Sequence, residues 1–156
     1  MGRDLANSFF AELHKSYLKP RGFTKQRRTF LRDKEKYVER FRFDGSLWNS
    51  EDRPWTFYFD VGIEFKDLPR RHPDRDFPNT HAHARINWIV EGSPKTFEIT
   101  EKNYSEMLQV INDLIDKASV ELPRVANSIY TKCQAGQYIM PPDLTRNSTV
   151  TPDGAR

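Results

Sequence analysis

Apolar side chains recur every four residues from Leu5 to Tyr17, a period that places them on one face of an α-helix. Pro20 and Gly22 follow directly. Proline cannot continue the helical hydrogen bonds, and glycine readily takes the left-handed conformation that is common at a helix end. The pattern predicts an amphipathic helix that ends near Leu18.

After this helix the period changes to two. Residues 29–32 and 37–44 alternate in this way and are separated by the charged segment 33–36, which is typical of a hairpin connection. Residues 55–65 form the longest alternation, with aromatic or aliphatic side chains at every second position. Since successive side chains of a strand point to opposite faces, we expect residues 55–65 to form a central antiparallel strand with one apolar and one polar face.

The middle of the chain combines a long loop with weaker strand patterns. Residues 66–82 contain three prolines and many charges, and long loops of this kind in small domains are often functional. Alternation returns over residues 83–90, and residues 95–100 are predicted to form a short edge strand.

A second helix is predicted near the C-terminal end. Asn103 and Glu106 have the spacing of a helix-capping pair, and an apolar stripe with helical spacing follows them. We expect this helix to run to about Val120, because Pro123 interrupts the hydrogen-bond ladder. From residue 134 the periodicity is lost and proline, threonine and serine become frequent, which indicates an irregular tail.

The order of helix, antiparallel strands and helix predicts an α+β domain of two layers. We assign residues 1–133 to this single domain and residues 134–156 to the irregular C-terminal tail. The antiparallel sheet is expected to contain about four to six strands. The N-terminal and C-terminal helices should both pack on its aromatic face, which leaves polar side chains on the opposite face.

Side chains of mixed charge fall on this second face by the same alternation. They form either cross-strand ion pairs on a solvated surface, which are common and weak, or a site that binds a partner, because directly opposed groups lie about 5 Å apart. The candidate partner-binding residues are Arg40, Arg42, Tyr58, Asp60, Glu64, Arg85 and Asn87 on this face, together with Trp48 in the loop of residues 45–54.

A metal site is a second hypothesis for the same region. His81 and His83 form an H-x-H pair, which in a strand places both imidazoles on one face. With Asp60 or Glu64 they supply the nitrogen and oxygen ligands of a zinc site, or of another divalent metal, with an open position for a substrate. The sequence has no second spaced pair of such ligands, so this hypothesis ranks behind partner binding.

Composition narrows the function classes. The chain has 156 residues, of which 37% are apolar and 13% aromatic, and so many rings exclude a disordered protein. No apolar segment approaches the roughly 20 residues of a membrane span, and the single cysteine, Cys133, excludes an internal disulfide. These features predict a cytoplasmic protein without membrane contact. No nucleophile elbow and no glycine-rich phosphate loop is present, so we assign no catalytic residue and no cofactor beyond that metal.

The net charge of +3 conceals an uneven distribution. Residues 1–42 carry 12 basic and 5 acidic side chains, a balance of +7, while residues 43–156 carry 13 and 17, a balance of −4. Basic side chains beside aromatic ones are typical of surfaces that bind nucleic acid, although a solvated helix face and a charged turn are the simpler interpretation. The basic candidates are Lys25, Arg27, Arg28, Arg32 and Lys34, with Phe23 and Phe30 beside them.

Several short motifs are similar to those of a bacterial family. They are Pro20-Arg21-Gly22-Phe23-Thr24-Lys25 after the first helix, Thr29-Phe30-Leu31-Arg32, Ser46-Leu47-Trp48-Asn49-Ser50, and Phe57-Tyr58-Phe59-Asp60-Val61-Gly62-Ile63. On these motifs the chain resembles the domain-of-unknown-function family 4304 over about residues 5–120. The resemblance implies a small cytoplasmic α+β domain of bacterial type, and it brings no activity that can be assigned to named residues.

We therefore expect a non-catalytic protein-interaction module, toxin-neutralising or regulatory, that binds another protein through the polar sheet face and the adjoining loops. One alternative is a metal-assisted hydrolase or nuclease that uses His81, His83 and Asp60. Another is a nucleic-acid-binding protein that uses the basic N-terminal third. An enzyme is the less favoured class, because the sequence contains no complete catalytic constellation.

Overall fold

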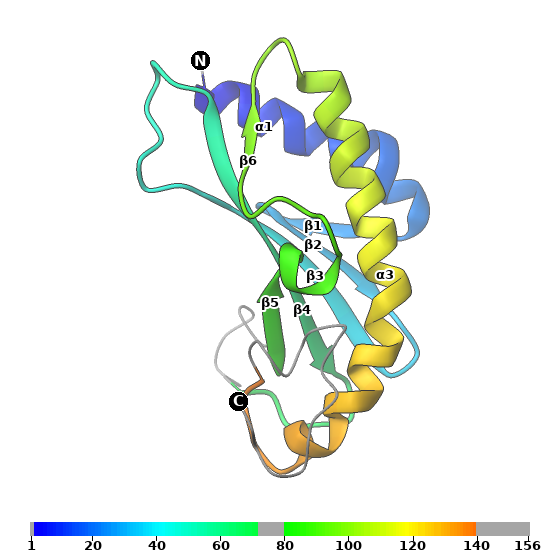
Figure 1. Cartoon of the computed structure of the whole chain (residues 1–156). Coiled ribbons are helices and arrows are strands. Elements are labelled where there is room, and N and C mark those ends of the chain that lie inside the picture. The colour runs from blue at the N-terminus through cyan, green and yellow to red at the C-terminus, as the bar shows by residue number, and fades with distance from the viewer. Residues whose placement is uncertain (1, 72–79, 140–156) are drawn as a thin grey trace.

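Helices cover one face of an antiparallel sheet in the computed structural model of this chain (Figure 1). The structure describes residues 2–71 and 80–139. In chain order its elements are α1 (Gly2–Glu12), the π-helical turn η1 (Leu13–Leu18), the 3-10 turn η2 (Lys19–Arg21), β1 (Thr24–Gln26), β2 (Thr29–Asp33), β3 (Tyr37–Gly45), β4 (Trp55–Phe65), β5 (Ala82–Arg85), α2 (Ile86–Ile89), β6 (Phe97–Ile99) and α3 (Tyr104–Gln134). The strand order is β1-β2-β3-β4-β5, and β6 pairs with β4 outside this order. The two-layer α+β architecture predicted from the sequence is confirmed.

The N-terminal helix ends as its proline and glycine predict. Helical turns continue past Leu18 to Arg21, and Gly22 then takes a left-handed conformation with a φ of 88°. The N–H of Gly22 donates to the carbonyl of Lys19, and the N–H of Phe23 donates to the carbonyl of Leu18, both at 3.1 Å. These bonds satisfy carbonyl groups at the helix end and lead the chain into β1.

β4 is the central strand, as its long alternation predicts. β3 lies antiparallel along one edge of β4, with Phe41 opposite Val61 and Phe43 opposite Phe59. The ring centres of Phe43 and Phe59 are 4.5 Å apart, and both rings are buried. Because side chains alternate along a strand, the residues between them point to the opposite sheet face.

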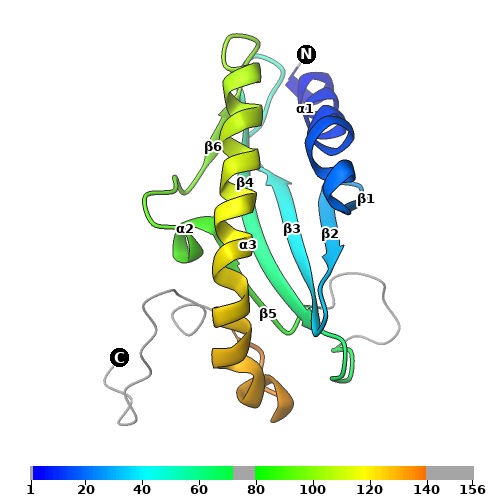
Figure 2. The ribbon, with the colours of Figure 1, turned by 90° about the vertical axis from the view of Figure 1, so that its right-hand side faces the viewer.

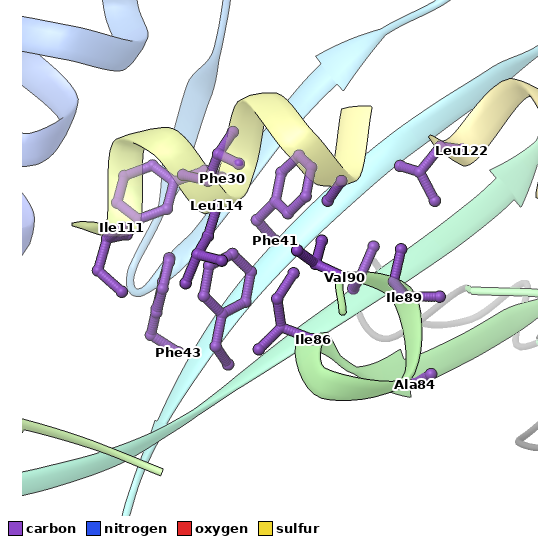
Figure 3. Packing of buried hydrophobic residues seen from close by; sticks show 14 of the residues in the cluster. Phe30, Phe41, Phe43, Ala84, Ile86, Ile89, Val90, Ile111, Leu114 and Leu122 are labelled. Carbon is purple, nitrogen blue, oxygen red and sulfur yellow. The ribbon is translucent and has the colours of Figure 1, made fainter. Parts of the chain in front are cut away.

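The aromatic sheet face forms the core together with the helices. α1 supplies Phe9 and Phe10, whose ring centres lie 6.4 and 5.5 Å from that of Phe57 on β4. α3 runs along the same face, as Figure 2 shows. Its Ile111 and Leu114 are buried among the side chains of the sheet (Figure 3). Removal of this apolar area from water is the main term that stabilises the fold.

The predicted strand over residues 83–90 is correct up to Arg85 and wrong from Ile86 onward. β5 ends at Arg85, and Ile86 begins the one-turn helix α2. β6 pairs with residues 55–57 of β4, whereas β5 pairs with residues 60–63. Since β3 occupies the other edge of β4, the two short strands share one edge, and the chain leaves the sheet between them.

α3 continues past Pro123 to Gln134, although the proline predicts an end near Val120. The apolar stripe of the helix extends beyond the proline through Val125 and Ile129, which are buried, while Pro123 itself is exposed. Burial of this stripe outweighs the backbone hydrogen bond that proline removes. Neither α3 nor any other helix in the described ranges has the length and apolar character of a membrane span.

The start of α3 follows Asn103 as predicted, but the side chain of Asn103 does not cap the helix. Its Oδ1 accepts a hydrogen bond from the N–H of Thr100 at 2.8 Å, and its Nδ2 donates to the carbonyl of Glu98 at 2.9 Å. Asn103 therefore closes the turn between β6 and α3, and does not bond to the first N–H groups of the helix.

The chain returns to the sheet after α3. Ile139 forms a parallel bridge with Ala82 on β5. The N–H of His83 donates to the carbonyl of Ile139, and the N–H of Ile139 donates to the carbonyl of His81, both at 3.1 Å. Ile139, which the sequence prediction places in the tail, is thus buried against the domain. The rest of that tail, from residue 140, lies outside the described residues.

Candidate functional site

β3, β4 and β5 bring most of the predicted polar side chains onto one sheet face. Arg42 on β3 lies opposite Asp60 on β4, and Asp60 lies opposite Arg85 on β5. Arg40 and Glu64 occupy the same face, because each lies an even number of positions along its strand from one of these residues. We call this surface, with Tyr58 and His83, the polar face.

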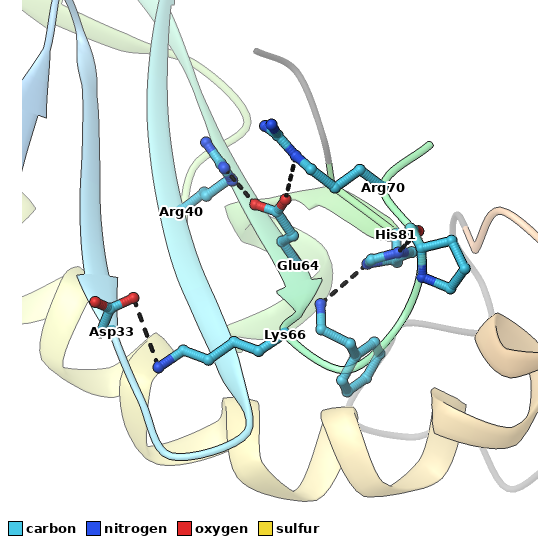
Figure 4. A network of polar contacts seen from close by, with 8 residues as sticks. Asp33, Arg40, Glu64, Lys66, Arg70 and His81 are labelled. Carbon is cyan, nitrogen blue, oxygen red and sulfur yellow. Dashed lines mark hydrogen bonds and ion pairs between the residues drawn. The ribbon is translucent and has the colours of Figure 1, made fainter. Parts of the chain in front are cut away.

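Glu64 binds two arginines on the polar face (Figure 4). The Nη2 of Arg40 donates to Oε2 of Glu64 at 2.5 Å, and the Nε of Arg70 donates to Oε1 at 3.3 Å. The side chains of Arg40 and Glu64 are only 7% and 11% exposed. Their charges are therefore neutralised within the domain, and a partner would have to break this arrangement to use them.

Asp60 and Arg85 form a second ion pair, in which Nη1 donates to Oδ1 at 3.0 Å. The guanidinium carbon of Arg85 also lies 4.3 Å from the ring centre of Tyr58. Burial raises the pKa of Asp60 to about 6, against the opposing effect of the Arg85 charge. Arg42 forms a further pair with Asp44 at 2.8 Å. The polar face is therefore mainly a network of internal ion pairs, which perturbs a pKa without requiring catalysis.

A pocket of about 170 Å³ lies on the polar face. Its floor includes Gly62, where an added Cβ would lie 2.5 Å from Cγ2 of Thr80. His83 lines the pocket, and its Nδ1 forms a hydrogen bond with the hydroxyl of Tyr138. Burial lowers the pKa of His83, and the charge of Arg85 lowers it further. Thr80 and Tyr138 thus cover part of the surface that the sequence predicts to be open for binding.

Asn87 does not belong to the polar face, and its predicted place on a strand of that face is wrong. It lies in α2 and not in a strand, because the chain leaves the sheet at Ile86. The alternation over residues 83–90 fits a strand equally well. Only the pairing of β6 with the same edge of β4 shows why the strand stops at Arg85.

Both ring nitrogens of His81 form hydrogen bonds with backbone groups, so its imidazole is not free to bind a metal. It is 4% exposed. Its Nδ1 accepts a hydrogen bond from the N–H of Phe65 at 3.0 Å, and its Nε2 donates to the carbonyl of Pro69 at 2.9 Å (Figure 4). The expectation that His81 and His83 present both imidazoles together is therefore wrong for His81. Within residues 2–71 and 80–139, no group of three or more His, Cys, Asp or Glu side chains is arranged to hold a metal ion.

The loop between β3 and β4 presents two adjacent apolar side chains to solvent. Leu47 is 98% exposed and Trp48 is 84% exposed. The loop projects beyond the sheet near the N-terminus of the chain (Figure 1). Sequence reasoning selects Trp48 but misses Leu47. The signal for both was an apolar pair inside a segment that otherwise consists of turn-forming residues.

Asn49 and Ser46 hold this loop in place. The Oδ1 of Asn49 accepts a hydrogen bond from the N–H of Thr56 at 2.8 Å, and its Nδ2 donates to the carbonyl of Thr56 at 2.7 Å. The N–H of Ser46 donates to the same carbonyl at 2.9 Å, and its Oγ accepts from the N–H of Trp48 at 3.2 Å. These hydrogen bonds therefore fix the base of the loop whose tip carries Leu47 and Trp48.

A cleft of about 1250 Å³ adjoins the base of this loop, between α1, the β1–β2 turn and the end of β3. Five basic side chains line it against a single carboxylate, that of Asp44. The basic residues are Arg3, Lys25, Arg27, Arg28 and Arg42. We call this the basic cleft.

Only part of the basic surface predicted from the sequence belongs to this cleft. Arg32 lies outside it and forms an ion pair with Glu39 at 2.5 Å. Lys34 lines a separate pocket beside α3. Phe23 and Phe30 are buried in the core, so they offer no ring surface to a ligand.

Comparison with known proteins supports a family assignment. The family model for DUF4304, described as a domain of unknown function, matches residues 14–136. This range contains the polar face, the β3–β4 loop and most of the basic cleft. No curated protein and no solved structure matches the chain significantly.

Proposed function

This chain belongs to the DUF4304 family, a domain of unknown function, and we propose that it acts as a non-catalytic protein-interaction module. Its contact surface is centred on Leu47 and Trp48 at the tip of the β3–β4 loop. The proposal places the module in the bacterial cytoplasm, where it neutralises a toxin or regulates a partner protein. A single buried thiol, that of Cys133, suits a reducing compartment.

The observation that carries this proposal is the exposure of two neighbouring large apolar side chains, at 98% and 84% for Leu47 and Trp48. A single exposed apolar residue is ordinary. Here two lie at one loop tip whose base is fixed by Asn49 and Thr56. Tryptophan is enriched among the residues that contribute most binding energy at protein interfaces. Because the base is already ordered, binding costs less conformational entropy than it would for a flexible loop.

The polar face supports this function less well than the loop tip. Its ion pairs join Arg40 to Glu64 and Arg85 to Asp60, so its charges are already compensated within the domain. The hypothesis of a metal-dependent hydrolase loses its main support, because both ring nitrogens of His81 form hydrogen bonds with backbone groups. Leu47 and Trp48 at the loop tip, in contrast, are exposed to solvent.

Site-specific photo-crosslinking tests the proposal. We would place p-benzoylphenylalanine at Trp48 in one variant and at Val120 in another, because Val120 on α3 is also apolar and is 77% exposed. We expect the probe at position 48, and not the one at position 120, to capture a distinct protein in irradiated cells. Capture of another copy of this chain would identify a homo-oligomer. Identical products from both positions would contradict the proposal.

A loss-of-contact variant supplies the matching control. With the crosslinker moved to Leu47, the substitution Trp48→Ala should reduce the yield of the product strongly, since it removes the larger anchor. The substitution Val120→Ala should leave the yield unchanged. Thermal unfolding of both variants should match that of the wild type, because neither side chain belongs to the core.

A further inference from the structure

We propose that the basic cleft binds an acidic polypeptide segment of the partner protein. This inference rests on the proposed function and names the chemistry of the partner. Gly45 and Ser46 line the cleft and lead directly into Leu47 and Trp48. A single partner surface can therefore contact the apolar tip and the cleft together.

The charge of the basic cleft is mostly uncompensated. Arg42 forms an ion pair with Asp44 at 2.8 Å. For the other four basic residues of the cleft, no carboxylate of the described chain lies within ion-pair distance. Burial lowers the pKa of Arg28, and the nearby charge of Arg3 lowers it further, as expected where positive charges repel one another. Such a surface attracts and orients an acidic partner.

Arg28 is held in position on the wall of the cleft, and Arg27 lies in the adjoining turn. Nη2 of Arg28 donates to Oδ1 of Asn7 at 2.9 Å, and its guanidinium lies 4.9 Å from the ring centre of Trp55. Arg27 occupies the turn between β1 and β2 with a φ of 56°, a left-handed conformation that is unfavourable for a residue other than glycine.

The aromatic residues of the cleft favour a polypeptide over a nucleic acid. Nucleic-acid grooves combine basic side chains with open ring faces on which successive bases stack. Here Phe10 and Phe43 are buried, and Arg28 lies over the ring of Trp55. Trp48, which is 84% exposed, is not among the residues that line the cleft. A carboxylate-rich segment needs cations and no row of rings, which matches the lining that is present.

Fluorescence anisotropy with two probes of equal charge tests this inference. One probe is fluorescein-labelled decaglutamate, and the other is a fluorescein-labelled single-stranded oligo-dT. We expect decaglutamate to bind the wild type at about 150 mM salt, more tightly than oligo-dT, with an affinity that falls as salt is added. No binding of decaglutamate would overturn the inference. Tighter binding of oligo-dT would assign the cleft to nucleic acid and would also overturn it.

Two charge-reversal variants show whether the cleft itself is the site. In the first, Lys25→Glu is combined with Arg27→Glu, and in the second, Lys117→Glu is combined with Arg124→Glu on the exposed side of α3. Both change the net charge equally. We expect the first variant to bind decaglutamate at least about tenfold more weakly than the wild type. The second should stay within about twofold. An equal loss in both would show attraction to net charge alone and would overturn the inference.

The loop-tip experiment separates this inference from the proposed function. If crosslinking at position 48 captures a partner but the Lys25 and Arg27 reversals change neither capture nor decaglutamate binding, the interaction module remains and the cleft assignment fails. If decaglutamate binds in the cleft but position 48 captures nothing, the proposed function fails.

Discussion

Arg40 on β3 and Glu64 on β4 form an ion pair with an N–O distance of 2.5 Å, at side-chain exposures of 7% and 11%. They lie on adjacent strands, where Arg40 is opposite Gly62 and Glu64 is opposite Val38. The absence of a side chain on Gly62 leaves room for Thr80 to pack over the strand. This pair links the two longest strands of the sheet on the face away from the core.

Removal of one member of this pair should destabilise the fold. In Arg40→Met the Glu64 carboxylate stays buried and keeps only the longer contact to Arg70 at 3.3 Å, so we expect the free energy of unfolding in urea to fall by about 3 kcal/mol. The double variant with Glu64→Leu should recover much of this loss, since apolar groups replace a buried ion pair at little cost. Arg124→Met, which breaks the exposed pair with Glu121, should cost less than about 0.5 kcal/mol. Equal losses at positions 40 and 124 would refute this account of the pair.

Asp60 should make stability depend on pH in mildly acidic solution. Its pKa is raised from 3.8 to about 6 by burial, so between these values the folded state binds more protons than the unfolded state. The free energy of unfolding should therefore fall as pH rises from about 4 to 6, by roughly 1 to 3 kcal/mol from this group. The measurement is urea unfolding of the wild type and Asp60→Asn across this range. As pH rises from about 4 to 6, the free energy of unfolding of the wild type should fall relative to that of Asp60→Asn. A difference between the two proteins that stays constant with pH would contradict the raised pKa.

His81 should act as a structural residue. His81→Ala removes the acceptor of the Phe65 N–H and the donor to the Pro69 carbonyl, and we expect a loss of about 2 kcal/mol in the free energy of unfolding. Nitrogen NMR shifts should identify the neutral tautomer with its proton on Nε2, because Nδ1 accepts a hydrogen bond from the backbone. Added zinc should not raise the melting temperature. A zinc-dependent rise that His81→Ala abolishes would reinstate the metal site.

We expect Arg27 to lower the free energy of unfolding and to strengthen the binding of decaglutamate. Arg27→Gly relieves the positive φ of 56°, so we expect the free energy of unfolding to rise by about 0.5 to 1 kcal/mol, while decaglutamate binds more weakly. Arg27→Lys keeps both the charge and the strained backbone and should change neither quantity much. If the glycine variant were less stable than the wild type, the turn would not be strained and this explanation would be wrong.

The sequence is most informative where local rules and burial agree. The alternation over residues 55–65 predicts β4 with its faces correctly assigned, because one period governs the whole strand. Pro20 and Gly22 predict the end of the first helix for a local stereochemical reason. Pro123 gives the wrong helix end. Its local effect on the helical hydrogen bonds is outweighed by the burial of Val125 and Ile129, which follow it in the helix.

The candidate site is less predictable, since its features depend on contacts between distant segments. The pattern of residues 83–90 contains no sign that β6 occupies the next part of the β4 edge, so Asn87 is misplaced. The H-x-H spacing shows two imidazoles but not the Phe65 and Pro69 backbone groups that bond to His81. The basic run is visible in the sequence, but its division into the basic cleft and an ion pair of Arg32 with the buried Glu39 requires the fold.

The bridge between Ile139 and Ala82 protects the sheet from association through its edges. A strand with unpaired N–H and C=O groups is a template for pairing with another chain. At β5 the hydrogen bonds of Ile139 with His81 and His83 occupy these groups, and at the opposite edge β1 is only three residues long and carries Lys25. Ile139 therefore covers part of this edge of the sheet, so that its backbone groups are not open to pairing with another chain.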